Sequence, residues 1–275
     1  MKKVVLISLF FFFFQKSYAE VLQEKPIVVL IASYNNAKWY KRNLDSALNQ
    51  NYSNYRVIYV DDCSPDGTGQ LVKKYIEKNG WQDRVTLVQN KSRKLKMENF
   101  YNSVHKYCED YEIVIDLDGD DWWVDEYVLA LINEAYADPD VWMTYGSYVG
   151  WPDPLVGGCE AIPAWVIVQN AYRSYQWVTS QQRTFYAWLF KKINPEDLKY
   201  DGNFLDMTAD LAYMFPMLEM AGGRFKYITE TLYVYNRANP INDNKQNIFR
   251  QLLLDGYLRG MKPYKKLSSR GEYVF

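Results

Sequence analysis

The sequence contains a single histidine, His105, among its 275 residues. Zinc sites and Ser-His-Asp triads both rely on histidine, so either would be hard to build in this chain. The three cysteines, Cys63, Cys108 and Cys159, include no C-x-x-C pair, so they predict neither a disulfide framework nor a zinc finger. Acid–base and metal chemistry therefore has to use carboxylates, which suit Mg²⁺ or Mn²⁺ in an all-oxygen site.

The chain also lacks an excess of charge of either sign. It has 32 basic and 33 acidic residues, for a formal net charge of -1. No global field then favours nucleic acid or an anionic membrane, so we expect no nucleic-acid partner, and any anionic ligand has to be bound by local groups. Hydrophobic residues make up 48% of the chain, which is enough for the sizeable core of one domain.

Residues 1–19 have the three-part layout of a secretory signal peptide. Lys2 and Lys3 are followed by an apolar core over residues 4–14, and a polar end closes in Ser17-Tyr18-Ala19. The apolar core is too short to span a bilayer comfortably. The layout predicts cleavage after Ala19 and a location in the secretory pathway or periplasm, including a membrane-associated form.

The stretch around which the chain is organised is residues 112–123, which read E-I-V-I-D-L-D-G-D-D-W-W. The β-branched residues predict a buried strand, and the strand stops in four acids, Asp116, Asp118, Asp120 and Asp121. Ligands of open α/β sheets bind at the carboxyl ends of the strands, and clustered carboxylates repel one another unless a cation or hydrogen-bond donors compensate. The run therefore predicts a metal site.

Three chemistries use such a run of acids. An EF-hand loop counted from Asp116 would need Gly and Glu at positions where the sequence has neither, which excludes that class. A haloacid-dehalogenase-type phosphatase would use Asp116 as nucleophile and Asp118 as general acid, but its later G-D-x-x-x-D motif is missing downstream. The third interpretation takes residues 118–120 as a D-x-D motif that holds a divalent ion against the diphosphate of a nucleotide sugar.

Three other predicted strands also end in polar residues, and helical spacing follows two of them. The strands are residues 27–31, 55–60 and 85–88, and the helices are residues 39–49 and 69–78. This alternation is typical of a parallel sheet. Because the strands of such a sheet end at one edge, we expect Tyr34, Asp62, Asn90 and Asp118 to converge.

Three segments of the first half carry a pattern that is specific when the segments occur in this order. They read I-V-V-L-I-A-S-Y-N-N, V-I-Y-V-D-D-C-S-P-D-G-T and I-D-L-D-G-D-D-W. The pattern resembles the nucleotide-binding half of family-2 glycosyltransferases of the GT-A fold, closely over residues 26–122 and loosely over 142–243. The resemblance implies an α/β, Rossmann-like GT-A fold with a mostly parallel central sheet flanked by helices. It also implies one domain over residues 26–260, with a nucleotide-sugar-binding half (26–123) and an acceptor half (124–260).

The resemblance implies roles for the polar groups at the strand ends. Tyr34 would lie against the nucleobase, and Asp62 would accept a hydrogen bond from its ring N–H, which favours a uridine-type donor. Asp118 would hold the ribose or a metal-bound water, and Asp120 would ligate the metal directly, whereas Asp116 is extra to the usual motif. The predicted donor set is Ser33, Tyr34, Asp61, Asp62, Asn90, Lys96, Asn99, Asp118 and Arg237, and the predicted metal set is Asp118 and Asp120.

The second half is where this family selects its acceptor, so the resemblance implies a carbohydrate or glycosylated acceptor. Asp210 matches the position of the family's catalytic base, although Ala209 replaces the glutamate that usually precedes it. Asp210 also lies in the first turn of a predicted helix, which Thr208 can cap, and an acid interacts well with the helix dipole there. Residues 183–190 are predicted to begin another helix.

The sequence therefore predicts a metal-dependent, inverting glycosyltransferase of the hexosyltransferase type that uses a nucleotide-sugar donor. Two alternatives stay open at this point. One is the phosphatase, and the other is a secreted carbohydrate-binding protein that keeps the fold without turnover. A nucleotidyltransferase is disfavoured because the chain has no Gly-rich loop for a triphosphate.

Overall fold

The computed structural model describes residues 22–241, 245 and 247–271. The predicted signal peptide and its cleavage site lie outside the described residues. No described helix is long and apolar enough to cross a membrane.

The N-terminal half, residues 26–123, alternates strands and helices as predicted. Its elements up to the carboxylate run are β1 (Ile27–Ser33), α1 (Tyr40–Leu48), β2 (Tyr55–Asp61), α2 (Thr68–Asn79), β3 (Val85–Gln89), α3 (Leu95–Tyr107) and β4 (Ile113–Asp118). β1, β2 and β4 are buried over almost their whole lengths, because their apolar side chains face covering layers on both sides.

The C-terminal half has shorter and more varied elements. They are β5 (Trp122–Trp123), α4 (Val128–Ala135), β6 (Met143–Trp151), α5 (Ala164–Val168), β7 (Thr184–Tyr186), α6 (Ala187–Lys191), a 3-10 turn (Pro195–Leu198), β8 (Lys199–Tyr200), β9 (Asn203–Phe204), α7 (Ala209–Ala221), β10 (Phe225–Asn236) and α9 (Ile248–Gly260). α7 is buried over almost its whole length, which explains why its sequence is apolar all round.

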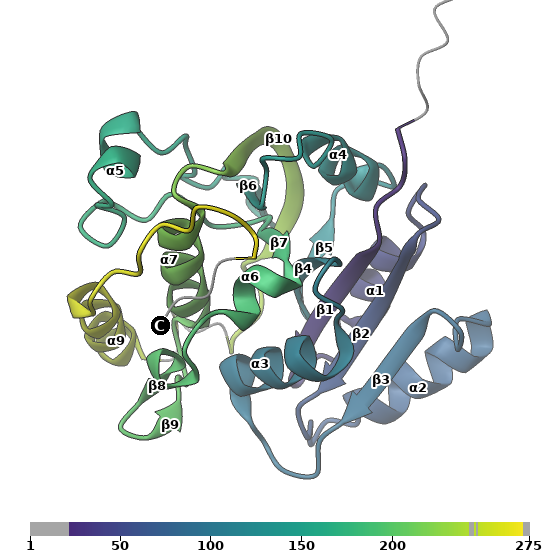
Figure 1. Cartoon of the computed structure of the whole chain (residues 1–275). Coiled ribbons are helices and arrows are strands. Elements are labelled where there is room, and N and C mark those ends of the chain that lie inside the picture. Colours follow the sequence, from purple (N-terminus) through teal and green to yellow (C-terminus); the bar gives the residue numbers. More distant parts are fainter. Residues whose placement is uncertain (1–21, 242–244, 246, 272–275) are drawn as a thin grey trace, which may run out of the picture.

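One eight-stranded sheet crosses both halves (Figure 1), with the strand order β3-β2-β1-β4-β7-β6-β10-β5. β1 to β4 pair in parallel, and β6 pairs in parallel with β10. The short β7 joins these two groups by pairing antiparallel with both β4 and β6. The predicted α/β fold with a mostly parallel central sheet is confirmed, while the division of the domain at residue 123 stays a prediction.

Two local predictions are wrong. Residues 183–190 do not begin with a helix, because residues 184–186 form β7 and α6 starts only at Ala187. Pairing with strands on both sides, in full burial, overrides the weak helical preference of this segment. Thr208 does not cap α7 either: its φ is +56°, and its hydroxyl donates to the carbonyl of Met207.

Candidate functional site: a carboxylate cluster at the edge of the sheet

The carboxyl ends of the parallel strands bring polar residues from separate segments to one edge of the sheet. In the strand register, Ser33 pairs with Asp61 on one side, and Ala32 pairs with Asp118 on the other. Asn90 follows β3, and its N–H donates to the carbonyl of Asp61 at 2.9 Å. The strand-end residues therefore converge as the sequence predicts.

The loop after β4 lies very close to the end of β1. A Cβ on Gly119 would fall 2.6 Å from the Cβ of Ser33 and 2.8 Å from the side-chain nitrogen Nδ2 of Asn36. Only glycine allows this approach, because any side chain would push the loop away. Segment 118–120 is thereby held beside the residues that β1 contributes.

Asp62 organises the loop that follows β3. Its carboxylate accepts hydrogen bonds, each at 2.8 Å, from the side-chain amide of Asn90 and from the N–H groups of Lys94 and Leu95. Asn90 also donates to the side chain of Asn99 at 2.6 Å, which ties the loop to α3. Both oxygens of Asp62 thus bind protein N–H groups here, and the ring N–H of a base would have to join or replace one of them.

A cavity of about 450 Å³ opens between α3 and strands β2 and β3. Its lining includes Val88, Asn90 and Asn99, of which the two asparagines belong to the predicted donor set. The ring of Tyr34 is covered by the guanidinium of Arg93, which lies 3.8 Å from the ring centre. The aromatic face predicted to receive a nucleobase is therefore occupied by a cation of the same chain.

Two residues of the predicted donor set are less well placed for a ligand. Asp61 is buried at the end of β2, and a Cβ on Gly69 of α2 would fall 2.5 Å from its carboxylate. Burial raises the pKa of Asp61 above its ordinary value. Arg237 is exposed, and its side chain lies against Gly150 rather than among the carboxylates.

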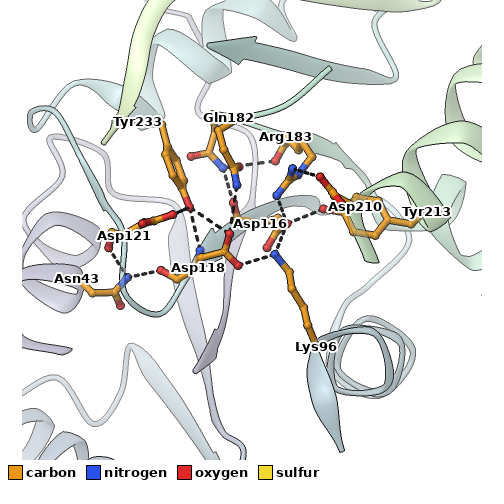
Figure 2. Close-up of polar contacts among 11 residues, drawn as sticks. Asn43, Lys96, Asp116, Asp118, Asp121, Gln182, Arg183, Asp210, Tyr213 and Tyr233 are labelled. Atoms are coloured by element: carbon orange, nitrogen blue, oxygen red, sulfur yellow. Dashed lines mark hydrogen bonds and ion pairs between the residues drawn. The ribbon is translucent and has the colours of Figure 1, made fainter. Parts of the chain in front are cut away.

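Figure 2 shows Asp116 and Asp118 among cationic side chains. The ammonium of Lys96 lies 3.1 Å from Oδ2 of Asp116 and also binds Oδ1 of Asp118. Asp116, which has no exposed surface, accepts two more hydrogen bonds, from Arg183 at 2.9 Å and from the hydroxyl of Tyr213. Burial alone would raise the pKa of Asp116, but Lys96 and Arg183 hold that pKa below its ordinary value.

Asp120 and Asp121 form no ion pair with any residue that the structure describes. Asp120 accepts a hydrogen bond from Asn239 at 2.7 Å, and Asp121 accepts from the Tyr233 hydroxyl at 2.6 Å and from the N–H of Asn236 at 2.7 Å. Burial, together with the charge of Asp118, raises the pKa of Asp120 to about 6. Burial and the neighbouring acids raise the pKa of Asp121 well above its ordinary value.

Amide side chains fix the backbone of this acidic segment. Asn43 donates to the carbonyls of Asp118 and Asp121 at 2.9 and 2.8 Å, as drawn in Figure 2. Gln182 donates to the carbonyl of Asp116 at 2.6 Å. These bonds come from α1 and from the segment before β7, so the position of the acids depends on both halves of the chain.

Arg183 connects the buried Asp116 to Asp210, the predicted base. One guanidinium nitrogen lies 2.9 Å from Asp116, and another lies 3.1 Å from Asp210. The side chain of Arg183 is only 2% exposed, whereas that of Asp210 is 28% exposed. Asp210 is thus the outward end of a row of paired charges that starts in the core of the sheet.

Sequence reasoning missed the residues that the C-terminal half contributes to this network. They are Gln181, Gln182, Arg183, Tyr213 and Tyr233. One signal was available, since Arg183 directly precedes an apolar and aromatic stretch in which a charge must find a buried partner. The tyrosines carried no such signal, because aromatic residues are frequent throughout the chain.

Asp118 and Asp120 offer carboxylate oxygens, the donors that Mg²⁺ and Mn²⁺ prefer. Within the described ranges, no group of three or more His, Cys, Asp or Glu side chains is arranged to hold a metal ion. Magnesium sites commonly use one or two carboxylates and take further oxygens from substrate phosphates. The two acids therefore fit a metal that is shared with a phosphate ligand and do not form a cage of protein groups alone.

Comparison with models of protein families matches residues 28–155 to glycosyl transferase family 2. The match confirms the resemblance to this family over the first half of the chain. The glycosyltransferase GlyA of Streptococcus pneumoniae is 22% identical to this chain over 228 residues, which cover 78% of the chain and 31% of GlyA. The chain thus spans about a third of the length of this relative.

Two solved structures are similar to this chain. Residues 1–349 of TarS from S. aureus align with a TM-score of 0.59 at 18% identity, over 77% of this chain and 60% of that one, and the same protein was also solved in complex with UDP-GlcNAc. The mannosyltransferase PcManGT from Pyrobaculum calidifontis, in complex with GDP-Man and Mn²⁺, aligns with a TM-score of 0.56 at 22% identity. The alignment covers 88% of this chain and 66% of PcManGT. At these identities the likeness establishes the fold, and it confirms the expected GT-A architecture.

Proposed function

We propose that this chain transfers a sugar, with inversion, from a nucleotide diphosphate donor to an acceptor hydroxyl, and that it uses a divalent metal ion. The observation that carries the proposal is the row of ion pairs through Asp116, Arg183 and Asp210. It places an outward-facing acid in the same network as Asp118 of the D-x-D segment, which Lys96 joins to Asp116. A base for the acceptor and a site for the donor diphosphate are then neighbours, as a direct displacement requires.

The donor would lie along the edge formed by the ends of β1 to β4. Tyr34 offers an aromatic face to a nucleobase once Arg93 moves aside, and the cavity beside Asn90 and Asn99 has the size of common ligand pockets. A carboxylate such as Asp62 can accept the ring N–H of uracil, which makes a uridine donor our first candidate. The relatives were solved with UDP-GlcNAc and with GDP-Man, so the base has to be tested.

Asp118 and Asp120 would hold the metal ion. Bound there, a divalent ion supplies positive charge that stabilises the leaving diphosphate. Lys96 already lies at Asp118, and Arg237 follows the end of β10, so both are candidates for a second positive charge near the phosphates. Of the two proposed ligands, Asp118 already pairs with Lys96, whereas Asp120 has no ion pair within the described residues, so Asp120 is the carboxylate whose charge the metal ion would chiefly compensate.

Asp210 would act as the general base. It takes the proton of the acceptor hydroxyl while that oxygen bonds to the anomeric carbon, and the bond from this carbon to the diphosphate oxygen breaks on the opposite face. The proton remains on Asp210, and the electron pair leaves with the diphosphate. Arg183 holds the carboxylate of Asp210 in position and is itself held by Asp116.

The phosphatase alternative would require Asp116 to attack a phosphate. Asp116 has no exposed surface, and one of its oxygens already accepts from Lys96, Arg183 and Tyr213. A nucleophile has to reach its substrate, so this carboxylate is better suited to structural pairing. The Asp116→Asn variant keeps the alternative testable, because only a phosphatase would lose ester hydrolysis through that change.

A thermal-shift screen of nucleoside diphosphates with and without Mn²⁺ tests the proposal first, because it reports the base and the metal together. We expect a shift with one nucleoside diphosphate that depends on Mn²⁺, followed by sugar transfer from the matching donor. Stabilisation by free sugars without nucleotide or metal would instead support the non-catalytic carbohydrate-binding alternative. Hydrolysis of simple phosphate esters would support the phosphatase.

A further inference from the structure

Helix α9 presents an apolar surface to solvent. Its large apolar side chains at Ile248, Phe249, Leu252, Leu253 and Tyr257 are 48%, 83%, 60%, 50% and 38% exposed. We call these five residues the α9 face. Members of this set that are three or four residues apart are neighbours on a helix, so the five lie along one side of α9, where a surface helix normally carries polar residues.

The α9 face is not the side by which the helix packs on the protein. Leu254 and Leu258 serve that purpose, and they are 0% and 1% exposed. A contiguous group of exposed apolar side chains of this size marks an interaction site more often than chance exposure. The helix therefore has two apolar sides, and among the residues that the structure describes only one of them is packed against the protein.

Strong contacts hold α9 in this orientation. Arg259 donates to the carbonyls of Arg173 and Tyr175 at 2.8 and 2.7 Å. Arg173 in turn donates to the carbonyl of Leu258 and forms a buried ion pair with Glu219 of α7 at 2.6 Å. The ion pair with Glu219 fixes Arg173, so α9 cannot turn its exposed side inward without breaking the hydrogen bonds of Arg259 and of the Leu258 carbonyl.

The segment that follows α9 is strongly basic. Residues 261–271 contain Lys262, Lys265, Lys266 and Arg270 and no acid, in a chain whose net charge is -1. The three lysines are exposed. An apolar helix face followed directly by lysines matches the two forces that hold a helix on an anionic lipid surface.

Helix α5 lies on the same side of the molecule as α9 (Figure 1), and it carries two more exposed apolar side chains. Trp165 is 51% exposed and Val168 is 84% exposed. Trp165 packs edge-on against Tyr175, at 5.7 Å between ring centres, and the carbonyl of Tyr175 accepts from Arg259 of α9. A tryptophan at this place suits a membrane–water interface, where its ring is preferred.

We infer that the α9 face and the basic segment 261–271 dock this chain on an anionic membrane surface, with α9 lying in the plane of the interface. A second copy of the chain is the other occupant to consider. Two copies joined through α9 would bring two lysine-rich segments to one interface, where like charges repel, whereas anionic lipid attracts them. The inference stands on the surface alone and does not depend on the proposed reaction.

Co-sedimentation with vesicles tests the inference, using phosphatidylcholine mixed with phosphatidylglycerol and phosphatidylcholine alone. We expect binding to the anionic vesicles that weakens with salt, and little binding to the neutral ones. Replacing Lys262, Lys265 and Lys266 by Gln should lower partitioning about a hundredfold, at roughly fivefold for each lysine. The pair Phe249→Ser and Leu252→Ser should lower it about tenfold or more for each side chain.

Matched controls come from α2, which Figure 1 shows on the opposite side of the molecule. Lys73, Lys74 and Lys78 are exposed, so their replacement by Gln removes the same charge away from α9, and Leu71→Ser removes an exposed apolar side chain there. Both controls should bind anionic vesicles like the parent. All variants change exposed residues, so the parental melting temperature is expected to be retained, which checks folding without reference to catalysis.

Three outcomes would overturn the inference. One is equal binding of the parent to neutral and anionic vesicles, or to neither. Another is an equal loss of binding in the α2 controls, which would point to general charge instead of the α9 face. The last is a stable dimer in lipid-free buffer that Phe249→Ser dissociates, because the face would then join two copies of the chain.

Discussion

Asp116 and Asp121 lie at the two ends of one short acidic segment, and neither has any exposed surface. Asp116 is surrounded by Lys96, Arg183 and the Tyr213 hydroxyl, and these groups hold its pKa below the ordinary value despite burial. Asp121 has the Tyr233 hydroxyl and a backbone N–H, and burial with the neighbouring acids raises its pKa well above the ordinary value. Two aspartates of one short segment thus have pKa values shifted in opposite directions, because cations surround Asp116 and acids surround Asp121.

This difference indicates two roles within one run of acids, a structural role for Asp116 and a cation-binding role at the other end. On the Asp116 side, the compensating charges are permanent parts of the fold, so the carboxylate is a structural partner that positions Arg183. Asp120 and Asp121 receive hydrogen bonds but no ion pair from the residues that the structure describes, which leaves them suited to a cation that arrives with a ligand. Substitutions of residues around Asp116 and around Asp121 test whether these contacts cause the difference.

The largest effect is expected for Asp210→Asn, at the outward end of the paired side. Turnover should fall by roughly two to four orders of magnitude, because the acceptor hydroxyl loses its base, while donor affinity changes little. Asp206→Asn, which removes an exposed carboxylate that pairs with Arg250, is the matched control and should retain turnover. Suppose instead that Asp210→Asn lowers the free energy of unfolding by about 1 kcal/mol or less and transfers sugar at the parental rate per folded molecule. Asp210 would then only stabilise the start of its helix.

Next in size is the loss of stability in Arg183→Met. It leaves Asp116 buried with one cation fewer, so the free energy of unfolding should fall by about 3–5 kcal/mol in urea titrations. Arg250→Met, which breaks the exposed pair with Asp206, should cost about 1 kcal/mol or less. Equal losses in the two variants would show that the buried pairing is not what distinguishes the Asp116 side.

Asp120→Asn tests the other side. The affinity for a nucleoside diphosphate in the presence of Mn²⁺ should fall at least about a hundredfold, since even partners of metal ligands cost ten- to a hundredfold, whereas affinity without metal should stay the same. Isothermal titration with and without Mn²⁺ measures both. Asp116→Asn is the companion variant and should lower stability while keeping the metal-dependent affinity. If Asp116→Asn lost the metal-dependent affinity and Asp120→Asn kept it, Asp116 would be the metal ligand and Asp120 the structural residue.

The smallest effects are expected from the two tyrosines that donate to the buried acids. Tyr213→Phe should cost about 1 kcal/mol of unfolding free energy, because Lys96 and Arg183 still bind Asp116. Tyr233→Phe should cost more, about 2–3 kcal/mol, because the described contacts leave Asp121 with only a backbone N–H. Denaturant unfolding measures both losses. Equal losses of unfolding free energy in the two variants would mean that the cations bound to Asp116 do not cause the difference between Asp116 and Asp121.

Local sequence patterns determined the strand ends of the N-terminal half. Apolar runs such as residues 27–31 and 113–115 can only be buried as strands, and the helical spacing between them requires parallel pairing. Parallel strands end at one edge, so the convergence of Tyr34, Asp62 and Asp118 followed without coordinates. The family resemblance then added a role for each of these residues, and those roles remain predictions.

Only the tertiary structure decided which groups from the C-terminal half reach these acids. Arg183 precedes β7, which lies between β4 and β6 in the sheet. A strand of three residues is too short for the alternation of apolar and polar residues to predict it. The ion pairs of Arg183 with Asp116 and Asp210 join segments far apart in the chain, and such pairing depends on burial and geometry that propensity does not encode. For the same reason, the opposite directions in which the pKa values of Asp116 and Asp121 are shifted result from the surrounding contacts, and the run of aspartates in the sequence does not distinguish the two residues.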